Sequence, residues 1–545
     1  MRRLLLALCA AVTALALGAV PATAAGPTTG SGGPPAEFGT DWHDPITAGP
    51  PVATPDTTSC HVTVAETEFR DYTPYKSAYT PPEGCGNRWN KVVLRLDGSV
   101  AGRQYDRLGY LRIGGVEVLR TSTPEPSPGG IAWHVEKDVT RYAATLRTAQ
   151  PVEMLIGNTV NETYTGVIKV KATLTFYAAE GRAKPADAPD RVLTLDGAHE
   201  AGTAYEGSLT VPRNSERITA EVYATGSGGG CEEFWYLAVP EAAPYSCKAA
   251  AGPHREVRIA VDGKLAGIAA PYPTVWTGGW SNPFLWYVVP GPRAFDVRPV
   301  EYDLTPFAGQ LNDGRPHRIT VSVAGVPEGQ SGWSTPTNVL VWQDAKASRI
   351  TGALTAHREG TPGGTTAYRP GTGHRVTADA HHSLTVSGYL DTSHGRVATT
   401  VARRVDASSA HRWTAGEDTD ALDARWTDDE SVTVHGRGPA TTHRVHRAYT
   451  MDGEITGAAG PRLRTVMTMG DRADSVTLRG GERTGWSRLD DTWTGDAAYH
   501  QNVPRDQRHA TGVSRERYRL LGPGSCWDRT LATAQGELTE DRFRC

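Results

Sequence analysis

The sequence predicts an all-β protein with two β-sandwiches side by side, followed by a further β-rich region. Three observations lead to this prediction. Segments such as "KVVLRLDG" and "REVRIAVDG" alternate apolar and polar residues up to an Asp-Gly turn signal. Turn signals recur at close spacing, and almost no segment has the 3.6-residue period of an amphipathic helix. Short strands joined by many turns are typical of sandwiches and barrels.

The first 25 residues have the pattern of a secretory signal peptide. Arg2 and Arg3 precede an apolar stretch from Leu4 to Val20, and small residues follow it. No later stretch reaches the ~20 apolar residues of a membrane span. We therefore expect a secreted protein that does not insert into membranes. Residues 26–57 are rich in Gly, Pro, Thr and Ala and are interpreted as a leader, either flexible or ordered on contact.

The cysteines predict three disulfides. Of seven cysteines, Cys9 lies in the signal peptide, and the other six form local pairs in the sequence. An even number in an exported chain indicates disulfide bonds rather than free thiols. No zinc-type spacing of Cys or His is present, so no metal is expected. The predicted pairs are Cys60–Cys85, Cys231–Cys247 and Cys526–Cys545.

The charge balance limits the possible partners. Lys and Arg total 56 against 60 Asp and Glu, and no basic stripe or polybasic patch stands out. Nucleic acid and anionic membranes are therefore not expected as partners. We expect a monomer without a cofactor.

An internal duplication relates residues 58–180, which we expect to form the first sandwich, to residues 190–348, which we expect to form the second. "LDGSVAG" and "VEKDVTRYAATL" in the first segment match "VDGKLAG" and "VEYDLTPFAGQL" in the second, with equal spacing between the motifs. In each copy we expect an Asp-Gly turn. We also expect Thr140 and Thr305 to be N-caps of a short helical turn, with Pro306 at the first helical position.

The duplication also divides the acidic residues into those that recur in both copies and those present in one copy only. Those that recur, and are therefore assigned to the scaffold, are Asp97, Glu136 and Asp138, matched by Asp262, Glu301 and Asp303. Asp106 does not recur, because Pro271 occupies the matching position. Glu232 and Glu233 have no evident counterpart either. Acids present in one copy only are the better functional candidates.

Residues 349–545 are expected to form a β-rich C-terminal domain. Thr, Arg and His become frequent there, and long stretches alternate as in antiparallel strands. The histidines at strand spacing are assigned to packing or solvated positions; they include His381, His382, His443 and His446. The sequence does not indicate a function for this region.

Several unusual blocks resemble the peptide-N-glycosidase A family, which removes N-glycans from glycopeptides. They are "AGRQYDRLGYLRIGGVEVLRTSTPEPSPGGIAWHVEKDVTRY", "IGNTVNETYTGVIKV", "EEFWY", "YPTVWTGGWSNPFLWYVVPGPRAFD" and "YDLTPFAGQLNDGRPH". The resemblance spans roughly residues 58–345. It implies two adjacent eight-stranded jelly rolls with a site at their interface. It also implies hydrolysis of the amide between an asparagine side chain and the first N-acetylglucosamine, in glycopeptide or glycoprotein substrates.

The resemblance also nominates site residues. The first catalytic acid of the bacterial relatives matches Asp106, in the triplet Tyr-Asp-Arg. The second matches the stretch Cys-Glu-Glu-Phe, where Glu233 aligns better than Glu232 and the choice stays open. A third acid of those relatives falls near Asn158. This position carries no carboxylate, so Asn158 is grouped with the substrate-binding residues.

The residues themselves suggest a water-dependent mechanism. No GxSxG elbow and no catalytic cysteine signature is visible. Water is then the expected nucleophile, with Asp106 as base or orienter and Glu233 orienting the sugar or assisting proton transfer. Arg107 is expected to hold the glycan or to stabilise negative charge, with a structural ion pair as the alternative. Gly228–Gly230 are expected to form a permissive loop, after which Glu232 and Glu233 point opposite ways if they lie on a strand.

Three tryptophans in one Gly- and Pro-containing block suggest a glycan-binding wall, with core packing as the alternative: Trp276, Trp280 and Trp286. Two other functions stay open at this point. One is a non-catalytic carbohydrate-binding sandwich, and the other is a structural surface module. Neither needs the carboxylates of Asp106 and Glu233 to converge, so their separation distinguishes both from an enzyme. Glycan preference, core-fucose tolerance and pH optimum do not follow from the sequence.

Overall fold

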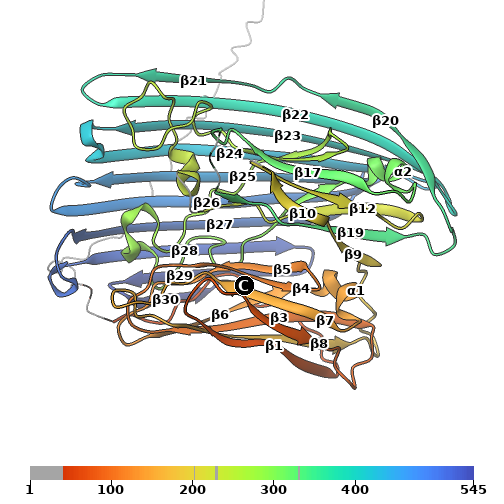
Figure 1. Cartoon of the computed structure of the whole chain (residues 1–545), viewed down its shortest axis with the longest axis horizontal. Coiled ribbons are helices and arrows are strands. Elements are labelled where there is room, and N and C mark those ends of the chain that lie inside the picture. The colour runs from red at the N-terminus through yellow and green to blue at the C-terminus, as the bar shows by residue number, and fades with distance from the viewer. Residues whose placement is uncertain (1–37, 39–40, 202, 228–230, 329, 331) are drawn as a thin grey trace, which may run out of the picture. The chain divides into compact units, whose positions relative to one another are not determined.

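The protein is built almost entirely from antiparallel strands. The computed structural model describes residue 38 and residues 41–545, except 202, 228–230, 329 and 331. The predicted signal peptide and the predicted Gly228–Gly230 loop lie outside the described residues. Residues 37–545 form one compact unit. The α-helices among the described residues are the single turns α1 (Ala143–Leu146) and α2 (Ala308–Leu311) (Figure 1). The all-β prediction is confirmed.

Eight strands of the first sandwich form two four-stranded sheets. Their orders are β1-β8-β3-β6 and β2-β7-β4-β5, which is the order in which a jelly roll distributes its strands. Buried residues alternate with more exposed ones on several strands, as on β8, whereas β5 is buried along its whole length. The elements are β1 (Ser59–Phe69), β2 (Tyr75–Tyr79), β3 (Trp89–Val100), β4 (Leu108–Ile113), β5 (Val116–Ser122), β6 (Ile131–Asp138), η1 (Thr140–Tyr142), β7 (Gln150–Ile156) and β8 (Ile168–Ala178).

The second sandwich repeats this topology. Its sheets run β9-β19-β12-β16 and β11-β17-β14-β15, with β10 added beside β11 and a small ribbon of β13 and β18. Strand for strand, β12 takes the place of β3 and β14 that of β4. The elements are β9 (Arg191–Thr194), β10 (Asp196–Ala201), β11 (Ala204–Leu209), β12 (Ser215–Val222), β13 (Thr225–Gly226), η2 (Glu232–Leu237), β14 (Glu256–Val261), β15 (Lys264–Ala269), η3 (Gly279–Ser281), η4 (Pro283–Leu285), β16 (Val300–Asp303), η5 (Thr305–Phe307), β17 (His317–Ala324), β18 (Trp333–Ser334) and β19 (Thr337–Gln343).

The Asp-x-Thr motif is a true structural repeat. Asp138 accepts the backbone N–H of Thr140, and Asp303 accepts that of Thr305. Each threonine hydroxyl then contacts the backbone of the neighbouring strand, at Val92 and at Ile218. The predicted N-cap role was wrong in detail. Both threonines are the first residues of their 3-10 turns, and the aspartates two positions earlier receive the free N–H.

The other half of the duplication motif was misaligned. Asp97 lies inside β3, opposite His134 of β6, and makes no turn. Asp262 does form a turn, because it joins β14 to β15 with a φ of 49°, followed by Gly263 at 79°. The topological counterpart of that turn is Gly114–Gly115, between β4 and β5. The match between "LDG" and "VDG" therefore does not reflect equivalent positions.

This correction changes the counterpart of Asp106. The residue lies in the connection from β3 to β4, and the equivalent connection in the second sandwich runs from β12 to β14. That second connection carries Glu232 and Glu233. Pro271, which the sequence offset assigned to Asp106, lies instead in the connection from β15 to β16. The two sandwiches therefore place acids on equivalent connections.

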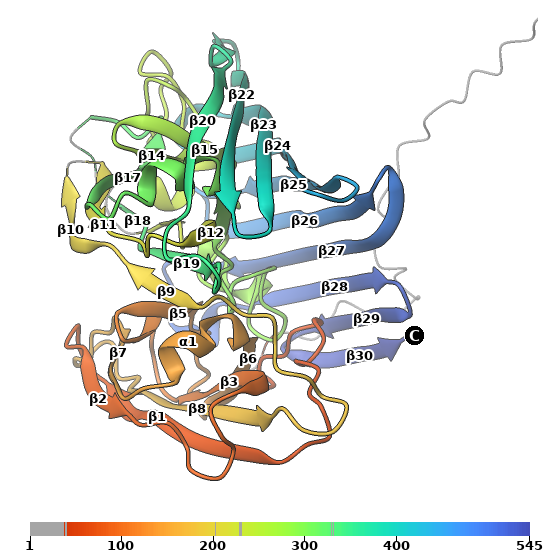
Figure 2. The same cartoon turned by 90° about the vertical axis from the view of Figure 1, so that its right-hand side faces the viewer.

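The C-terminal region is one long antiparallel sheet. Its strands follow in chain order from β20 to β30, with β21 pairing β22. Figure 2 shows the orange first sandwich below the yellow-green second one, with the long strands reaching beyond both to the right. The elements are β20 (Thr351–Glu359), β21 (Gly363–Arg369), β22 (His374–Thr392), β23 (Gly395–Trp413), η6 (Ala415–Glu417), β24 (Thr419–His435), β25 (Thr441–Thr456), β26 (Arg462–Arg479), β27 (Glu482–His500), η7 (Arg505–Gln507), β28 (Thr511–Gly522), β29 (Ser525–Ala534) and β30 (Glu537–Phe543).

All strands of the three regions fall inside the ranges that the sequence assigned to them, although the contacts join residues 37–545 into one unit. The predicted division into three domains stays a prediction. Of the four histidines singled out, His382 is buried against Glu256, and His446 pairs with Asp429 at the surface. Both positions are the packing or solvated kind that was expected.

The described part of the leader is ordered by contact with the rest of the chain. Trp42 stacks on Tyr287 with ring centroids 3.9 Å apart. The backbone N–H of Ala48 donates to Glu516, and its carbonyl accepts from the Trp527 indole. Of the two interpretations offered for residues 26–57, ordering on contact therefore applies to residues 41–57.

The structure joins the three predicted cysteine pairs, with Cα atoms 5.4 to 6.1 Å apart, within the usual range for disulfides. Within the described residues, no helix has the length and apolarity that crossing a membrane would require.

Candidate active site

Asp106 stands where connections of the two sandwiches meet. Its Oδ1 lies 2.7 Å from the point at which a Cβ on Gly278 would stand, and the Gly278 backbone N–H donates to the carboxylate. Burial raises the pKa of Asp106 to about 6, although the Gly278 N–H and the Arg107 charge act in the opposite direction. A carboxyl group with such a pKa can accept a proton near neutral pH.

Glu125 is a second acid at the same place, and the sequence reasoning missed it. It lies between β5 and β6, is 7% exposed, and has Oε1 3.0 Å from the same Gly278 position. The Tyr287 hydroxyl donates to its Oε2 over 3.4 Å. Burial, followed by the charge of Asp106, raises the pKa of Glu125 well above the usual range. Glu125 belongs to the family-like block "TSTPEPSPGG", but only burial beside Asp106 distinguishes it from a turn residue.

Glu233 is the third member of the cluster. It lies at the start of η2, half-buried. Burial raises its pKa to about 7, and the charge of Asp106 contributes to the same shift. Asp106 is therefore close enough to both glutamates to change their ionisation. Among the residues that the structure describes, none of the three carboxyls forms an ion pair.

Glu232 has a different role from its neighbour. The segment is a 3-10 helix and not the strand that was considered. The carboxylate of Glu232 is buried and binds the Arg255 guanidinium through both oxygens, at 2.7 and 2.9 Å, and it also accepts the indole N–H of Trp333. With its oxygens engaged in a buried ion pair, Glu232 holds the η2 turn in place. This arrangement favours Glu233 as the free acid.

The disulfide Cys231–Cys247 is directly attached to this turn. Cys231 is the residue before η2, and its carbonyl accepts the N–H of Phe234. The bond closes a loop of 16 positions on the connection that carries Glu233. The bridge thus fixes the segment on which the third acid sits.

Arg107 and Asn158 are both held by hydrogen bonds within the first sandwich. The guanidinium of Arg107 donates to Gln104, and no ion pair forms with the described residues. Its charge still lowers the pKa of Asp106. Asn158 is fully buried; its amide nitrogen donates to the carbonyls of Phe69 and Gly166. Asn158 therefore pins the loop after β7, and the substrate-binding assignment was wrong for this residue.

The tryptophan block is packed and not exposed. Trp276, Trp280 and Trp286 are at most 5% exposed, so none offers a free ring face to a sugar. Trp286 stacks on Trp493 of β27 at 4.1 Å, and the six-membered ring of Trp280 abuts Gly453 of β25. The glycan-binding wall is corrected to the packing alternative. These anchors hold the connection from β15 to β16, and with it Gly278, against Asp106.

An exposed aromatic pair borders the acids instead. Tyr105, next to Asp106 in the chain, is 46% exposed. Its ring centroid lies 5.2 Å from that of Tyr164, over which Arg103 lies at 5.6 Å. These rings present apolar faces to solvent, which is a surface suited to sugar rings.

A cavity of about 970 Å³ lies elsewhere, between β6, the segment 290–301 and the C-terminal sheet. Some of its charged residues form ion pairs, as in Lys137–Asp296 at 3.1 Å and Arg141–Glu221 at 2.7 Å, and two of its acids, Asp491 and Glu516, are buried and interact with each other. None of the three unpaired acids lines it. We therefore do not place the site there.

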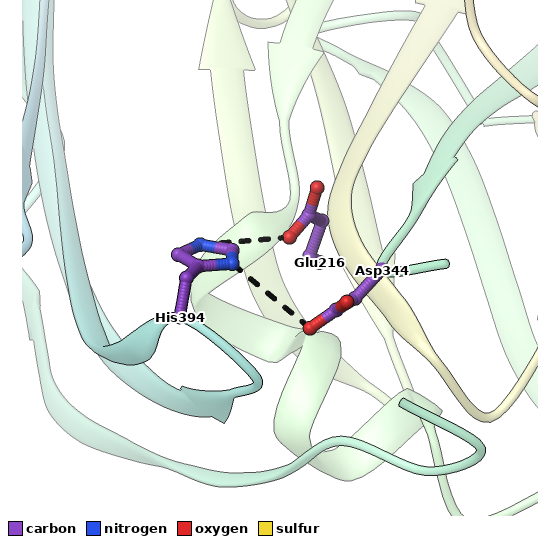
Figure 3. Close-up of side chains that lie close together, drawn as sticks. All are labelled: Glu216, Asp344 and His394. Atoms are coloured by element: carbon purple, nitrogen blue, oxygen red, sulfur yellow. Dashed lines mark ion pairs between the residues drawn. The ribbon is translucent and has the colours of Figure 1, made fainter. Parts of the chain in front are cut away.

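One further cluster has ligand-type side chains. Ligand atoms of Glu216, Asp344 and His394 lie within 4.8 Å of one another (Figure 3). Asp344 already accepts the N–H groups of Ser393 and Lys346 and the Ser393 hydroxyl, at 2.7 to 2.9 Å. These bonds dock the turn between β22 and β23 onto the second sandwich, which accounts for the cluster without a metal.

The fold and the acids together define a class of protein: paired jelly rolls in which carboxyls of raised pKa, with no ion pair to the described residues, lie where the connections of the two sandwiches meet. The family model described as peptide N-acetyl-β-D-glucosaminyl asparaginase amidase A matches residues 48–360. The chain belongs to this family.

Two known proteins are similar over part of the chain. Peptide-N4-(N-acetyl-β-glucosaminyl)asparagine amidase A of Prunus dulcis is 31% identical over 339 residues, which are 56% of this chain. The chain spans 58% of the length of that relative. A solved structure of PNGF-II covers 52% of this chain and 65% of its own, at 14% identity and a TM-score of 0.37. The likeness to PNGF-II is too weak to support an argument.

Proposed function

We propose that this protein is a secreted amidase that hydrolyses the bond between an asparagine side chain and the first N-acetylglucosamine of an N-glycan. The observation that carries the proposal is the meeting of Asp106 and Glu125 at Gly278, with Glu233 near enough for the charge of Asp106 to raise its pKa. None of these three acids forms an ion pair with the described residues, and all lie inside the segment that matches the family model. Acids shifted in this way are suited to moving protons near neutral pH.

The proposed reaction assigns one step to each of two acids. Asp106, ionised above about pH 6, takes a proton from the attacking water, whose oxygen bonds to the amide carbon. Glu233, protonated below about pH 7, gives its proton to the leaving nitrogen as the carbon–nitrogen bond breaks. The products are an aspartate side chain and a glycosylamine. Glu125, which keeps its proton over a wider pH range, supplies a hydrogen-bond donor beside Asp106.

The surroundings fit a glycopeptide. Tyr105 and Tyr164 offer ring faces to a sugar at the rim. Arg107 keeps negative charge favourable at Asp106, which is the state the base requires. The amino-terminal residues 1–25 and the three disulfides fit a secreted protein.

The test is glycan release from a defined glycopeptide in water enriched in ¹⁸O, followed by mass spectrometry. Amidase action converts the asparagine to an aspartate that carries one ¹⁸O, whereas an endoglycosidase leaves a sugar on the asparagine. Binding without turnover would favour a non-catalytic carbohydrate-binding protein and would contradict the proposal.

Two variants test the assignments. Asp106→Asn is expected to lower kcat by at least about 10²-fold with the fold intact, because the amide cannot accept the proton. The pH profile of the wild type should peak between about 6 and 7, falling on the acidic side as Asp106 is protonated and on the alkaline side as Glu233 is deprotonated. Glu233→Gln should be impaired and should lose the alkaline limb. Near-normal turnover of folded Asp106→Asn would refute the mechanism.

A further inference from the structure

The C-terminal sheet reaches the acid cluster through one of its turns. The connection from β27 to β28 contains η7 and lies far outside residues 48–360, the segment matched by the family model. Its backbone is held by Arg508, whose carbonyl accepts the His500 N–H at 2.7 Å. Gln501 anchors it further, since its amide nitrogen donates to three backbone carbonyls of the turn between β25 and β26. The connection is therefore positioned and not a loose loop.

Arg505 is linked to Glu125 by a short series of contacts. Its guanidinium lies 5.2 Å from the ring centroid of Trp42, and Trp42 stacks on Tyr287. Arg505 also hydrogen-bonds Tyr287. The Tyr287 hydroxyl in turn donates to the Glu125 carboxylate. Only the Tyr287 side chain thus separates the Arg505 charge, in the β27–β28 connection, from the Glu125 carboxyl.

Arg508 is linked to Tyr287 through two other aromatic rings. Its guanidinium lies 5.8 Å from the centroid of Tyr499, which packs on Phe284 at 5.3 Å. Phe284 packs on Tyr287 at the same centroid distance. Both arginines are half-buried.

Arg505 and Arg508 differ from two arginines on strands of the C-terminal sheet in whether their charge is paired with a carboxylate. Arg464 and Arg529 form two-pronged ion pairs with Asp496 and Asp541. Within the described part of the chain, neither Arg505 nor Arg508 forms an ion pair. Half-buried guanidinium groups carry a desolvation cost, and a nearby carboxylate is the usual compensation. Both charges favour the ionised form of Glu125 and lower its pKa.

We propose that the C-terminal sheet is part of the amidase site, with Arg505 and Arg508 as positioning residues that govern the protonation of Glu125. This inference rests on the proposed function. The charged and titratable groups that act on Glu125 come from four elements: Asp106 of the β3–β4 connection, Tyr287 of the β15–β16 connection, Tyr499 of β27, and Arg505 and Arg508 of the β27–β28 connection.

The two cations limit how far burial and the charge of Asp106 raise the pKa of Glu125. Each positive charge stabilises a Glu125 carboxylate, so its removal makes the proton harder to lose. Because Asp106 and Glu125 interact, the pair titrates as a unit, and its apparent pKa values should rise together. At an effective dielectric constant suited to a partly exposed site, a unit charge near the cluster shifts a pKa by about 0.5 to 1 unit.

The experiment compares Arg505→Gln, Arg508→Gln and the double variant with the wild type, over the pH dependence of kcat/KM on a defined glycopeptide. Because Glu125 is coupled to Asp106, the acidic limb should move to higher pH by about 0.5 to 1 unit per charge removed, whereas the alkaline limb, assigned to Glu233, should stay in place. Arg505→Lys should restore the wild-type profile, since the lysine keeps the charge. Arg483 is exposed at the opposite end of β27 and forms no ion pair with the described residues, so Arg483→Gln is the matched control and should shift nothing.

A purely structural role would lower activity or thermal stability without moving the profile, and that result would overturn the proposal. A ¹³C NMR titration of glutamate-labelled protein, with Glu125 assigned from its absence in Glu125→Gln, reads the same pKa without turnover. If the wild type lacks amidase activity, the proposed function fails. The titration still decides the arginine inference, because an unmoved Glu125 in Arg505→Gln and Arg508→Gln would contradict it.

Discussion

Gly278→Ala provides a sharp test of the acid cluster, because it adds one methyl group at the point where two carboxyls meet. The backbone of Gly278, at φ −99° and ψ 0°, is open to alanine, so the change creates no conformational strain of its own. The new Cβ would stand 2.7 Å from Oδ1 of Asp106 and 3.0 Å from Oε1 of Glu125. Both distances are shorter than a van der Waals contact.

The magnitude follows from the displacement required. The Asp106 carboxylate has to move by roughly half an ångström to regain normal contact with the methyl group. A misplacement of about 1 Å costs on the order of 10²-fold in rate, so we expect a loss of kcat/KM between ~10-fold and ~10²-fold. Overpacking should cost at most about 1–3 kcal/mol of stability. The methyl also removes water from the carboxyls, so the acidic limb should move to higher pH.

The assay is glycan release from a defined glycopeptide across pH, with circular dichroism and thermal melting to confirm the fold. Gly438→Ala is the control, since no atom lies within 4 Å of its added Cβ. A folded Gly278→Ala protein with wild-type kcat/KM and an unchanged pH profile would show that the acids at Gly278 are not the site. Loss of activity in both variants would indicate a general effect of the substitution.

Three further predictions concern stability and the frame of the site. Glu232→Gln should destabilise the protein by about 3–5 kcal/mol in chemical denaturation, because it leaves the buried Arg255 without its counter-charge. The buried carboxyls of Asp491 and Glu516 interact, and burial raises the pKa of Glu516 to about 7. Because the folded state holds the Glu516 proton more tightly than the unfolded state, stability should fall as pH rises from about 4.5 to about 7. Glu516→Gln should flatten that fall in melting temperature, because it removes the group that titrates in this range, and an unchanged slope would contradict the assignment. Replacing Cys231 and Cys247 by serine should cost roughly 3 kcal/mol and lower kcat/KM, which reduction of the folded protein should reproduce.

Features that depend on local pattern could be predicted from the amino-acid sequence alone. Strand alternation gave the all-β class, and local cysteine spacing gave the three disulfides. The Asp-x-Thr repeat correctly indicated a duplication, because its bonds are made within a few residues and to the adjacent strand. Asp106 and Glu233 could be nominated because they lie in unusual family-like blocks.

Tertiary structure decided which of those residues meet, since that depends on contacts between distant segments. Glu125 is recognisable only once it is buried against Asp106, and Glu232 is removed from the candidates only by Arg255. The tryptophans looked exposed because their block reads as a loop, yet β27 covers Trp286 from more than 200 positions away in the chain. The "LDG" and "VDG" match failed for a related reason: an Asp-Gly pair can sit inside a paired strand when its neighbours supply the hydrogen bonds. Burial and pairing at a distance, which set the charges of an acid cluster, are not properties of any local stretch of sequence.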